Sequence, residues 1–182
     1  MTTAHALNRR TIALVGLMGS GKSSIGRSLA AVLDMPFRDA DAEVESAAGQ
    51  LIPDIFANLG EGAFREGERK VIARLLDYPP QVLATGGGAF MNHETRDLIK
   101  RNAVSVWLKV DVDVMARRVG RKDNRPLLAG RDPAGVLRSL AEVRNPVYAL
   151  ADVTVETGDI PHKTAVDSVI AALRGYYEKA TA

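Results

Sequence analysis

A glycine-rich octapeptide near the amino terminus carries the clearest chemistry in this sequence. Residues 16–23, Gly-Leu-Met-Gly-Ser-Gly-Lys-Ser, fit the pattern G-x-x-x-x-G-K-[ST] of a phosphate-binding loop. Its glycines allow successive backbone N–H groups to turn toward one anion, and a following helix adds its positive end. We expect Lys22 to reach the outer phosphates of a nucleoside triphosphate and the Ser23 hydroxyl to hold magnesium. The predicted nucleotide site comprises Gly19, Ser20, Gly21, Lys22, Ser23 and Ser24.

The segments on either side of this loop help to decide whether the pattern marks a nucleotide site or is a chance match. Residues 11–15, Thr-Ile-Ala-Leu-Val, form an apolar, β-branched run typical of a buried strand. From residue 23 to 33, apolar side chains recur with the spacing of one helix face. The alternative is an ordinary glycine turn with a surface lysine. The order strand, glycine loop, helix favours the nucleotide site.

Two further groups follow predicted strands and could serve a second substrate. Asp39 and Asp41 come after the short strand predicted at 35–38, and in an extended segment their carboxylates would point the same way. One could lie near a metal ion and one near an attacking hydroxyl, but an aspartate here also suits a helix N-cap. Residues 86–88, all glycine, follow the strand predicted at 81–85. They could bring backbone N–H donors close to a ligand or form a flexible turn.

Basic side chains gather in a segment without helix or strand periodicity. Residues 120–132 contain charges, glycine and proline, and we expect them to form a functional loop that acts as a mobile lid. The basic cluster that begins at Arg117 would suit a polyphosphate ligand. Arg65 has an ordinary explanation, because it lies on a predicted helix beside glutamates with which it could pair on a solvated face.

The composition indicates one globular domain. Of 182 residues, 46% are hydrophobic and 25% charged, and the net charge of +2 is too small to indicate a nucleic-acid partner. The absence of cysteine excludes disulfides and thiolate metal sites. No apolar run approaches the roughly 20 residues of a membrane span, and residues 1–10 do not resemble a signal peptide. We therefore expect a cytoplasmic protein without a membrane partner. We also expect it to act as a monomer.

The predicted elements alternate between strands and helices, which indicates a parallel sheet with helices on both faces. The five predicted strands are 11–15, 35–38, 81–85, 103–108 and 152–156. We expect a three-layer α/β/α fold of the nucleoside-monophosphate-kinase-like, P-loop NTPase class, in a single domain over residues 1–182. Ligands of such sheets bind beyond the carboxyl ends of the strands. The phosphate loop, the acidic pair and the triple glycine should therefore face one crevice.

Together these motifs resemble the shikimate kinase family. The resemblance spans about residues 11–160, and the motifs that carry it are residues 16–23, Asp39-x-Asp41, Phe64-Arg65, the triple glycine, Arg125-Pro126-Leu127-Leu128 and Arg144-x-Pro146-x-Tyr148. It implies ATP-dependent phosphorylation of the 3-hydroxyl of shikimate, giving shikimate 3-phosphate and ADP on the route to chorismate and the aromatic amino acids. It also implies one magnesium ion, bound with ATP.

The resemblance implies a role for each residue of the substrate site. Asp41 would bind the shikimate hydroxyls and orient or deprotonate the nucleophile. Arg65 and Arg144 would bind the substrate carboxylate, a task that suits guanidinium groups. Backbone N–H groups of the triple glycine would also contact the substrate. This part of the predicted site consists of Asp41, Arg65, Gly86, Gly87, Gly88 and Arg144.

The same resemblance implies roles at the nucleotide. Lys22 and Arg125 would be catalytic together with Asp41, and Arg125 would close over the transferring phosphate from the lid. Arg118 would stack on the adenine. Ser23 would be a direct magnesium ligand, and Asp39 would reach the ion through water.

Three other functions use a similar loop. A regulatory GTPase would carry an N-K-x-D segment, which this sequence lacks. A nucleotide-binding protein without catalysis would have lost Lys22, Asp41 or the arginines, and all are present. Another small-molecule kinase of this fold, for example one for gluconate, is the nearest alternative. The paired arginines and the triple glycine favour a carboxylated cyclic polyol over gluconate.

Overall fold

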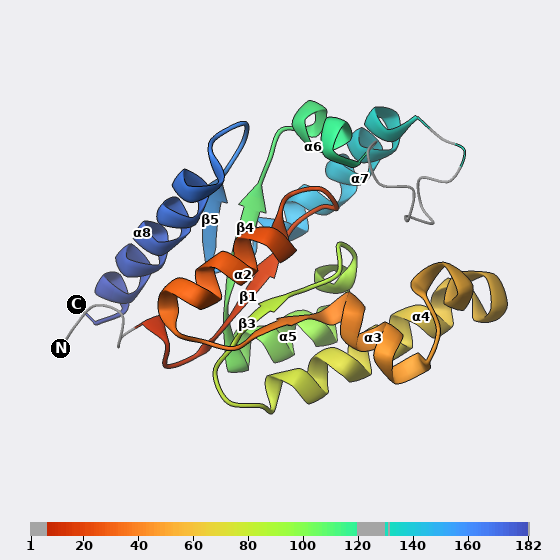
Figure 1. The fold of residues 1–182 in the computed structure, drawn as a ribbon, viewed down its shortest axis with the longest axis horizontal. Coiled ribbons are helices and arrows are strands. Elements are labelled where there is room, and N and C mark those ends of the chain that lie inside the picture. The colour runs from red at the N-terminus through yellow and green to blue at the C-terminus, as the bar shows by residue number, and fades with distance from the viewer. Residues whose placement is uncertain (1–6, 120–129, 131, 182) are drawn as a thin grey trace.

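The computed structural model describes residues 7–119, 130 and 132–181, and its centre is a five-stranded sheet (Figure 1). The strands are β1 (Thr11–Val15), β2 (Phe37–Asp39), β3 (Val82–Ala84), β4 (Ala103–Lys109) and β5 (Val153–Glu156). Their order is β2-β3-β1-β4-β5, and every neighbouring pair is parallel. The predicted parallel sheet is therefore confirmed, with the strand that feeds the phosphate loop at its centre.

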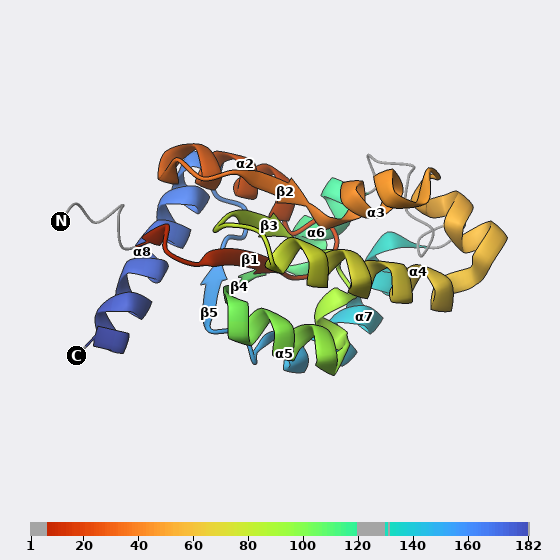
Figure 2. The same cartoon turned by 90° about the horizontal axis from the view of Figure 1, so that it is seen from below.

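Helices cover both faces of this sheet (Figure 2). In the described residues they are α2 (Lys22–Leu33), α3 (Ala40–Ala48), α4 (Ile52–Leu76), the 3₁₀ helix η1 (Ala89–Met91), α5 (His93–Asn102), α6 (Val112–Val119), α7 (Pro133–Tyr148) and α8 (His162–Thr181). The helices α2 and α8 lie on one face, and α5 and α7 on the other. The expected three-layer α/β/α architecture is confirmed.

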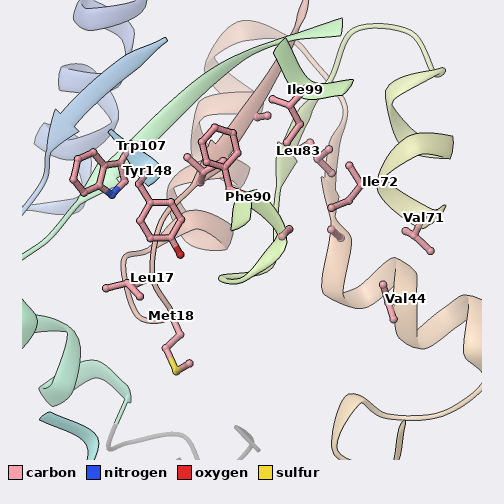
Figure 3. Close-up of a cluster of buried hydrophobic side chains, with 14 of the residues drawn as sticks. Leu17, Met18, Val44, Val71, Ile72, Leu83, Phe90, Ile99, Trp107 and Tyr148 are labelled. Atoms are coloured by element: carbon pink, nitrogen blue, oxygen red, sulfur yellow. The ribbon is translucent and has the colours of Figure 1, made fainter. Parts of the chain in front are cut away.

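The central strand separates two hydrophobic cores. Ile12 and Leu14 point into the core shared with α2 and α8, and Ala13 and Val15 into the core shared with α4, α5 and α7. Figure 3 shows part of the second core. Because both faces of β1 are buried, its sequence is an unbroken apolar run and not an alternating one.

Long-range packing extends beyond the sheet through α3 and α4, which project to one side of the molecule (Figure 1). The helix α4 is interrupted at Gly60, whose φ of 85° and ψ of 169° are not helical. Two helical segments therefore meet at this glycine. The second segment, which follows Gly60, carries Arg65 toward the sheet.

The predicted lid at 120–132 lies almost entirely outside the described residues, as does Arg125. Gly130 and Asp132 are described, and Asp132 caps the first turn of α7 by accepting a hydrogen bond from the Gly135 N–H at 3.1 Å. Among the helices of the described residues, none is both long and apolar enough to cross a membrane.

Candidate active site

The phosphate loop connects β1 to α2 through backbone conformations that favour glycine. Gly16, Gly19 and Gly21 have φ values of 143°, 81° and 93°, a region that other residues rarely adopt. Gly19 also lies so close to α6 that an added methyl group would be 2.6 Å from Val119 Cγ2. The loop therefore needs these glycines both for its path and for its packing. Its backbone leads directly into the amino-terminal end of α2, where an anion is favoured.

Lys22 folds back over the loop that precedes it. Its Nζ donates to the carbonyl oxygens of Gly16 at 2.8 Å and Leu17 at 2.9 Å, and the residue is only 9% exposed. These contacts hold a positive charge beside the loop and the first turn of α2. A polyphosphate bound there would meet the ammonium group at close range, as the sequence predicts.

Ser23 and Asp39 meet at the carboxyl end of the sheet. The Ser23 hydroxyl donates to Asp39 Oδ2, while Asp39 Oδ1 accepts from the N–H groups of Asp41 at 3.0 Å and Ala42 at 3.4 Å. Asp39 therefore caps α3 and faces the phosphate loop at once, so the two alternatives drawn from the sequence are compatible.

The prediction that Asp39 and Asp41 share an extended segment is wrong. Only Asp39 is extended, with φ −110° and ψ 118°, and Asp41 lies in the first turn of α3. The reason is the cap itself, because the bonds from the Asp41 and Ala42 N–H groups to Asp39 Oδ1 start α3 at Ala40. Both side chains nevertheless line the same pocket.

The pair of Ser23 and Asp39 has the chemistry of a magnesium site that is completed by a nucleotide. Magnesium prefers oxygen ligands and usually takes only one or two from the protein, with phosphates and water supplying the rest. No group of three or more histidine, aspartate or glutamate residues that could hold a metal occurs in the described part of the chain. The hydroxyl and the carboxylate therefore suit an ion that arrives with the nucleotide.

The triple glycine lies in close contact with side chains that are predicted to bind the substrate. A methyl group added to Gly86 would overlap the Glu68 carboxylate and lie 2.9 Å from Asp41 Oδ1. One added to Gly88 would lie 2.6 Å from Cζ of Arg65. A side chain at either position would require the end of the Glu68 or Arg65 side chain to shift, so this segment is a close-packed loop and not merely a flexible turn.

The middle glycine meets the third predicted residue. A methyl group added to Gly87 would lie 3.5 Å from Nη1 of Arg144 and 3.4 Å from the backbone nitrogen of Met18 in the phosphate loop. Arg144 is buried on α7. The glycine loop thus lies between the phosphate loop and the carboxylate and guanidinium groups expected to hold a second substrate.

Glu68 is a site residue that the sequence analysis missed. Arg65 Nη1 donates to Glu68 Oε2 at 2.9 Å, and Arg65 Nη2 lies 3.4 Å from Glu61. The expected pairing on a solvated face is only half correct, because Glu68 is just 2% exposed. Its Oε1 has no hydrogen-bond partner within the residues that the structure describes. Burial raises the pKa of Glu68, with the Arg65 charge opposing the shift and the Asp41 charge adding to it.

A signal for this burial does exist in the sequence. The inward stripe of α4 runs through Phe64, Val71, Ile72 and Leu75, all buried. Glu68 occupies the position four residues after Phe64, where the helical period calls for an apolar side chain. A carboxylate at such a position indicates a buried partner or a site.

Arg118 bridges the phosphate loop and the loop after β5. Its guanidinium donates to the carbonyl oxygens of Gly19 at 3.3 Å and Gly158 at 3.0 Å. This places a planar cation at the edge of the nucleotide pocket, where a base could stack on it. Ser24 lies on the same side, with Oγ 3.4 Å from His162 Nδ1.

One pocket of about 580 Å³ gathers most of the predicted residues. Those on its wall are Gly19, Gly21, Lys22, Ser23, Ser24, Asp39, Asp41, Gly87 and Arg118. Arg65 and Arg144 are not on this wall and contact the glycine loop that closes one end of it. The arrangement is that of a pocket beside the phosphate loop joined, across Asp41 and Gly87, to a cluster that holds two guanidinium groups.

Comparison with known proteins relates most of the chain to one family. The family model described as shikimate kinase matches residues 18–174. A shikimate kinase of Caulobacter vibrioides is 68% identical over 168 residues, covering 92% of this chain and 84% of that protein. A shikimate kinase of Bradyrhizobium diazoefficiens is 56% identical over 171 residues, covering 94% of this chain and 83% of that protein.

Solved structures agree in fold. A shikimate kinase from Acinetobacter baumannii in complex with shikimate has a TM-score of 0.87 and 37% identity, covering 92% of this chain and 94% of that one. A gluconokinase from Sinorhizobium meliloti has a TM-score of 0.66 and 22% identity, covering 96% of this chain and 97% of that one. At that identity the second likeness concerns the fold alone.

Proposed function

This chain belongs to the shikimate kinase family, and on that premise we propose that it transfers the γ-phosphoryl group of ATP to the 3-hydroxyl of shikimate. The products are ADP and shikimate 3-phosphate, on the route to chorismate. The observation that carries the proposal is the glycine loop, which packs against Asp41, Arg65 and Arg144 immediately beside the phosphate loop. A carboxylated polyol would find there the Asp41 carboxylate and two guanidinium groups, one of which pairs with Glu68.

The substrate end of the site suits a ring that bears a carboxylate and hydroxyls. Arg65 and Arg144 would bind the carboxylate through charge-assisted hydrogen bonds, and Asp41 would accept from the hydroxyls. As the base, Asp41 would take the proton of the attacking 3-hydroxyl while the oxygen bonds to phosphorus. The N–H groups of Gly87 and Gly88 would add neutral donors.

The nucleotide end suits a polyphosphate. Lys22 would stabilise the charge that develops on the transferring group, and loop N–H groups would hold the phosphates. Magnesium, held by Ser23 and through water by Asp39, would neutralise phosphate charge when bound. We also assign Arg118 to the adenine and Arg125 to the transferring phosphate.

The remaining assignments concern the molecule as a whole. We propose one kinase domain over residues 1–182 that acts as a monomer. Analytical ultracentrifugation of the active enzyme would test the oligomeric state. A cytoplasmic location stays a prediction for cell fractionation.

A coupled assay of ADP release from MgATP tests the function. We expect strong stimulation by shikimate and none by gluconate. ADP release that shikimate does not stimulate would refute the proposed activity, and stimulation by gluconate alone would favour the alternative kinase.

Replacing Arg65 by lysine tests the carboxylate site. Lysine keeps a positive charge beside Glu68 but loses the planar fork, so the KM for shikimate should rise about 10- to 100-fold with the KM for MgATP unchanged. Arg69→Lys is the matched control, because Arg69 lies four residues later on α4 and pairs with the exposed Glu66 at 2.9 Å. Equal effects of the two variants would refute the assignment of Arg65.

A further inference from the structure

Tyr148 is a fully buried phenol whose hydroxyl has a specific partner. Its ring is 0% exposed and packs between Trp107 and Phe90, with ring centroids 5.9 Å and 6.5 Å away (Figure 3). The hydroxyl points away from both rings and donates to the carbonyl oxygen of Gly87. Burial raises the pKa of Tyr148 to about 12, so the group remains a protonated donor at neutral pH.

The carbonyl that Tyr148 holds is the one that the local turn leaves unbound. The Gly86 carbonyl accepts from the Ala89 N–H at 3.2 Å, and the Gly88 carbonyl accepts from the Met91 N–H at 3.1 Å. Both bonds come from neighbouring residues of η1. The Gly87 carbonyl instead accepts from a side chain 61 residues away. The middle peptide of the loop therefore depends on a tertiary contact for its orientation.

The hydrogen bond from Tyr148 to the Gly87 carbonyl also determines the direction in which the Gly88 N–H points, because both groups belong to one peptide. In a planar trans peptide the C=O of one residue and the N–H of the next point opposite ways, and none of the described peptides is cis. Holding the Gly87 oxygen on the Tyr148 side therefore turns the Gly88 N–H to the other side. Across residues 7–119 and 132–181, no backbone hydrogen bond uses the N–H of Gly87 or Gly88. A glycine peptide rotates easily, so nothing in the local sequence would hold this orientation.

Tyr148 also fixes the position of α7 relative to the glycine loop. Arg144 precedes Tyr148 by one helical turn, and its Nη1 lies 3.5 Å from the position of a Gly87 methyl group. The packing against Trp107 and Phe90 fixes that turn of the helix. A guanidinium and a backbone donor from distant segments are thereby held in one arrangement.

We propose that Tyr148 is a positioning residue of the substrate site, whose hydroxyl orients the Gly87–Gly88 peptide so that the Gly88 N–H donates to the substrate. The proposal rests on the proposed function, because it takes shikimate as the molecule that accepts this bond. Tyr148 would act through the glycine loop and through Arg144, which interacts with the phenol group. Its effect is therefore specific for one of the two substrates.

Tyr148→Phe removes the hydroxyl and keeps the ring, and steady-state kinetics with calorimetric binding of shikimate provide the readout. We expect the KM and Kd for shikimate to rise about 5- to 20-fold, as for the loss of one oriented hydrogen bond, with the KM for MgATP within about twofold. Tyr177→Phe is the hydroxyl control, because the Tyr177 oxygen is buried without a hydrogen-bond partner in the described structure. Val169→Ala in the opposite core controls for lost stability.

Each outcome decides the proposal. A selective loss of shikimate affinity in Tyr148→Phe, with both controls close to wild type, supports it. Lower thermal stability with unchanged shikimate affinity, or an equal loss of affinity in Val169→Ala, shows a merely structural role and overturns it. Wild-type protein that binds no shikimate overturns the proposed function and this proposal together, whereas wild-type binding with an unaffected Tyr148→Phe overturns this proposal alone.

Discussion

Replacing Glu68 by glutamine should remove a pH dependence from the stability of this protein. Glu68 is 2% exposed, its pKa is raised by burial, and its Oε2 accepts from Arg65 at 2.9 Å. Glutamine has nearly the same shape and can still accept this bond, but it does not titrate. The comparison therefore isolates the charge of one buried carboxylate.

The direction of the effect follows from proton linkage. The ordinary pKa of 4.5 describes the unfolded chain, and the folded value is higher. Between the two values the folded protein holds a proton that the unfolded chain has released, so the stability contributed by Glu68 is complete below pH 4.5 and decreases as the pH rises through the folded pKa. The slope is at most about 1.4 kcal/mol per pH unit. The free energy of unfolding of wild type should therefore fall relative to that of Glu68→Gln across this window and then run parallel to it.

Urea denaturation from pH 4 to pH 8 measures this difference. Glu66→Gln is the matched control, because Glu66 lies two residues away on α4, is exposed and has a pKa that its hydrogen bond to Arg69 lowers. The free energy of unfolding of wild type should not fall relative to that of Glu66→Gln as the pH rises. A difference in the free energy of unfolding between wild type and Glu68→Gln that stays constant over the whole pH range would refute the raised pKa of Glu68. It would also refute the view that burial disfavours the charged carboxylate. A rise of the shikimate KM in Glu68→Gln would further show that the charge orients Arg65.

Three other substitutions test the phosphate loop, the magnesium site and the glycine loop. Lys22→Ala should lower kcat about 100- to 1000-fold with an unchanged circular dichroism spectrum, because it removes charge stabilisation in the transition state. Ser23→Ala should raise the magnesium concentration for half-maximal activity about tenfold or more in a metal titration. Gly86→Ala should lower the free energy of unfolding by about 1–3 kcal/mol in urea, because the methyl group has no space beside Glu68 and Asp41.

Controls within the chain sharpen these tests. An alanine at Gly62 meets no atom within 4 Å and should not destabilise α4, so equal losses at positions 62 and 86 would contradict the packing argument. Activity of Lys22→Ala within tenfold of wild type would remove Lys22 from the catalytic step. An unchanged magnesium dependence of Ser23→Ala would remove that hydroxyl from the metal site.

The local elements of this fold could be predicted because they depend on short stretches of chain. The strand predicted at 11–15 is β1 with the same bounds, and its unbroken apolar run reflects burial on both faces. The glycines of the phosphate loop correspond to backbone angles that few other residues adopt. Periodicity and backbone sterics act over one or two turns, which is the range that a sequence pattern can reveal.

The sequence by itself also determined the nucleotide site, since strand, loop, lysine and serine are contiguous. Only the tertiary structure decided the burial of Glu68, the close packing of the triple glycine and the bond from Tyr148 to the Gly87 carbonyl. Each depends on segments that are far apart in the chain and meet only when the sheet is assembled. A local pattern records what a residue could do, whereas desolvation and contact, which fix a pKa or orient a peptide, arise from its neighbours in space.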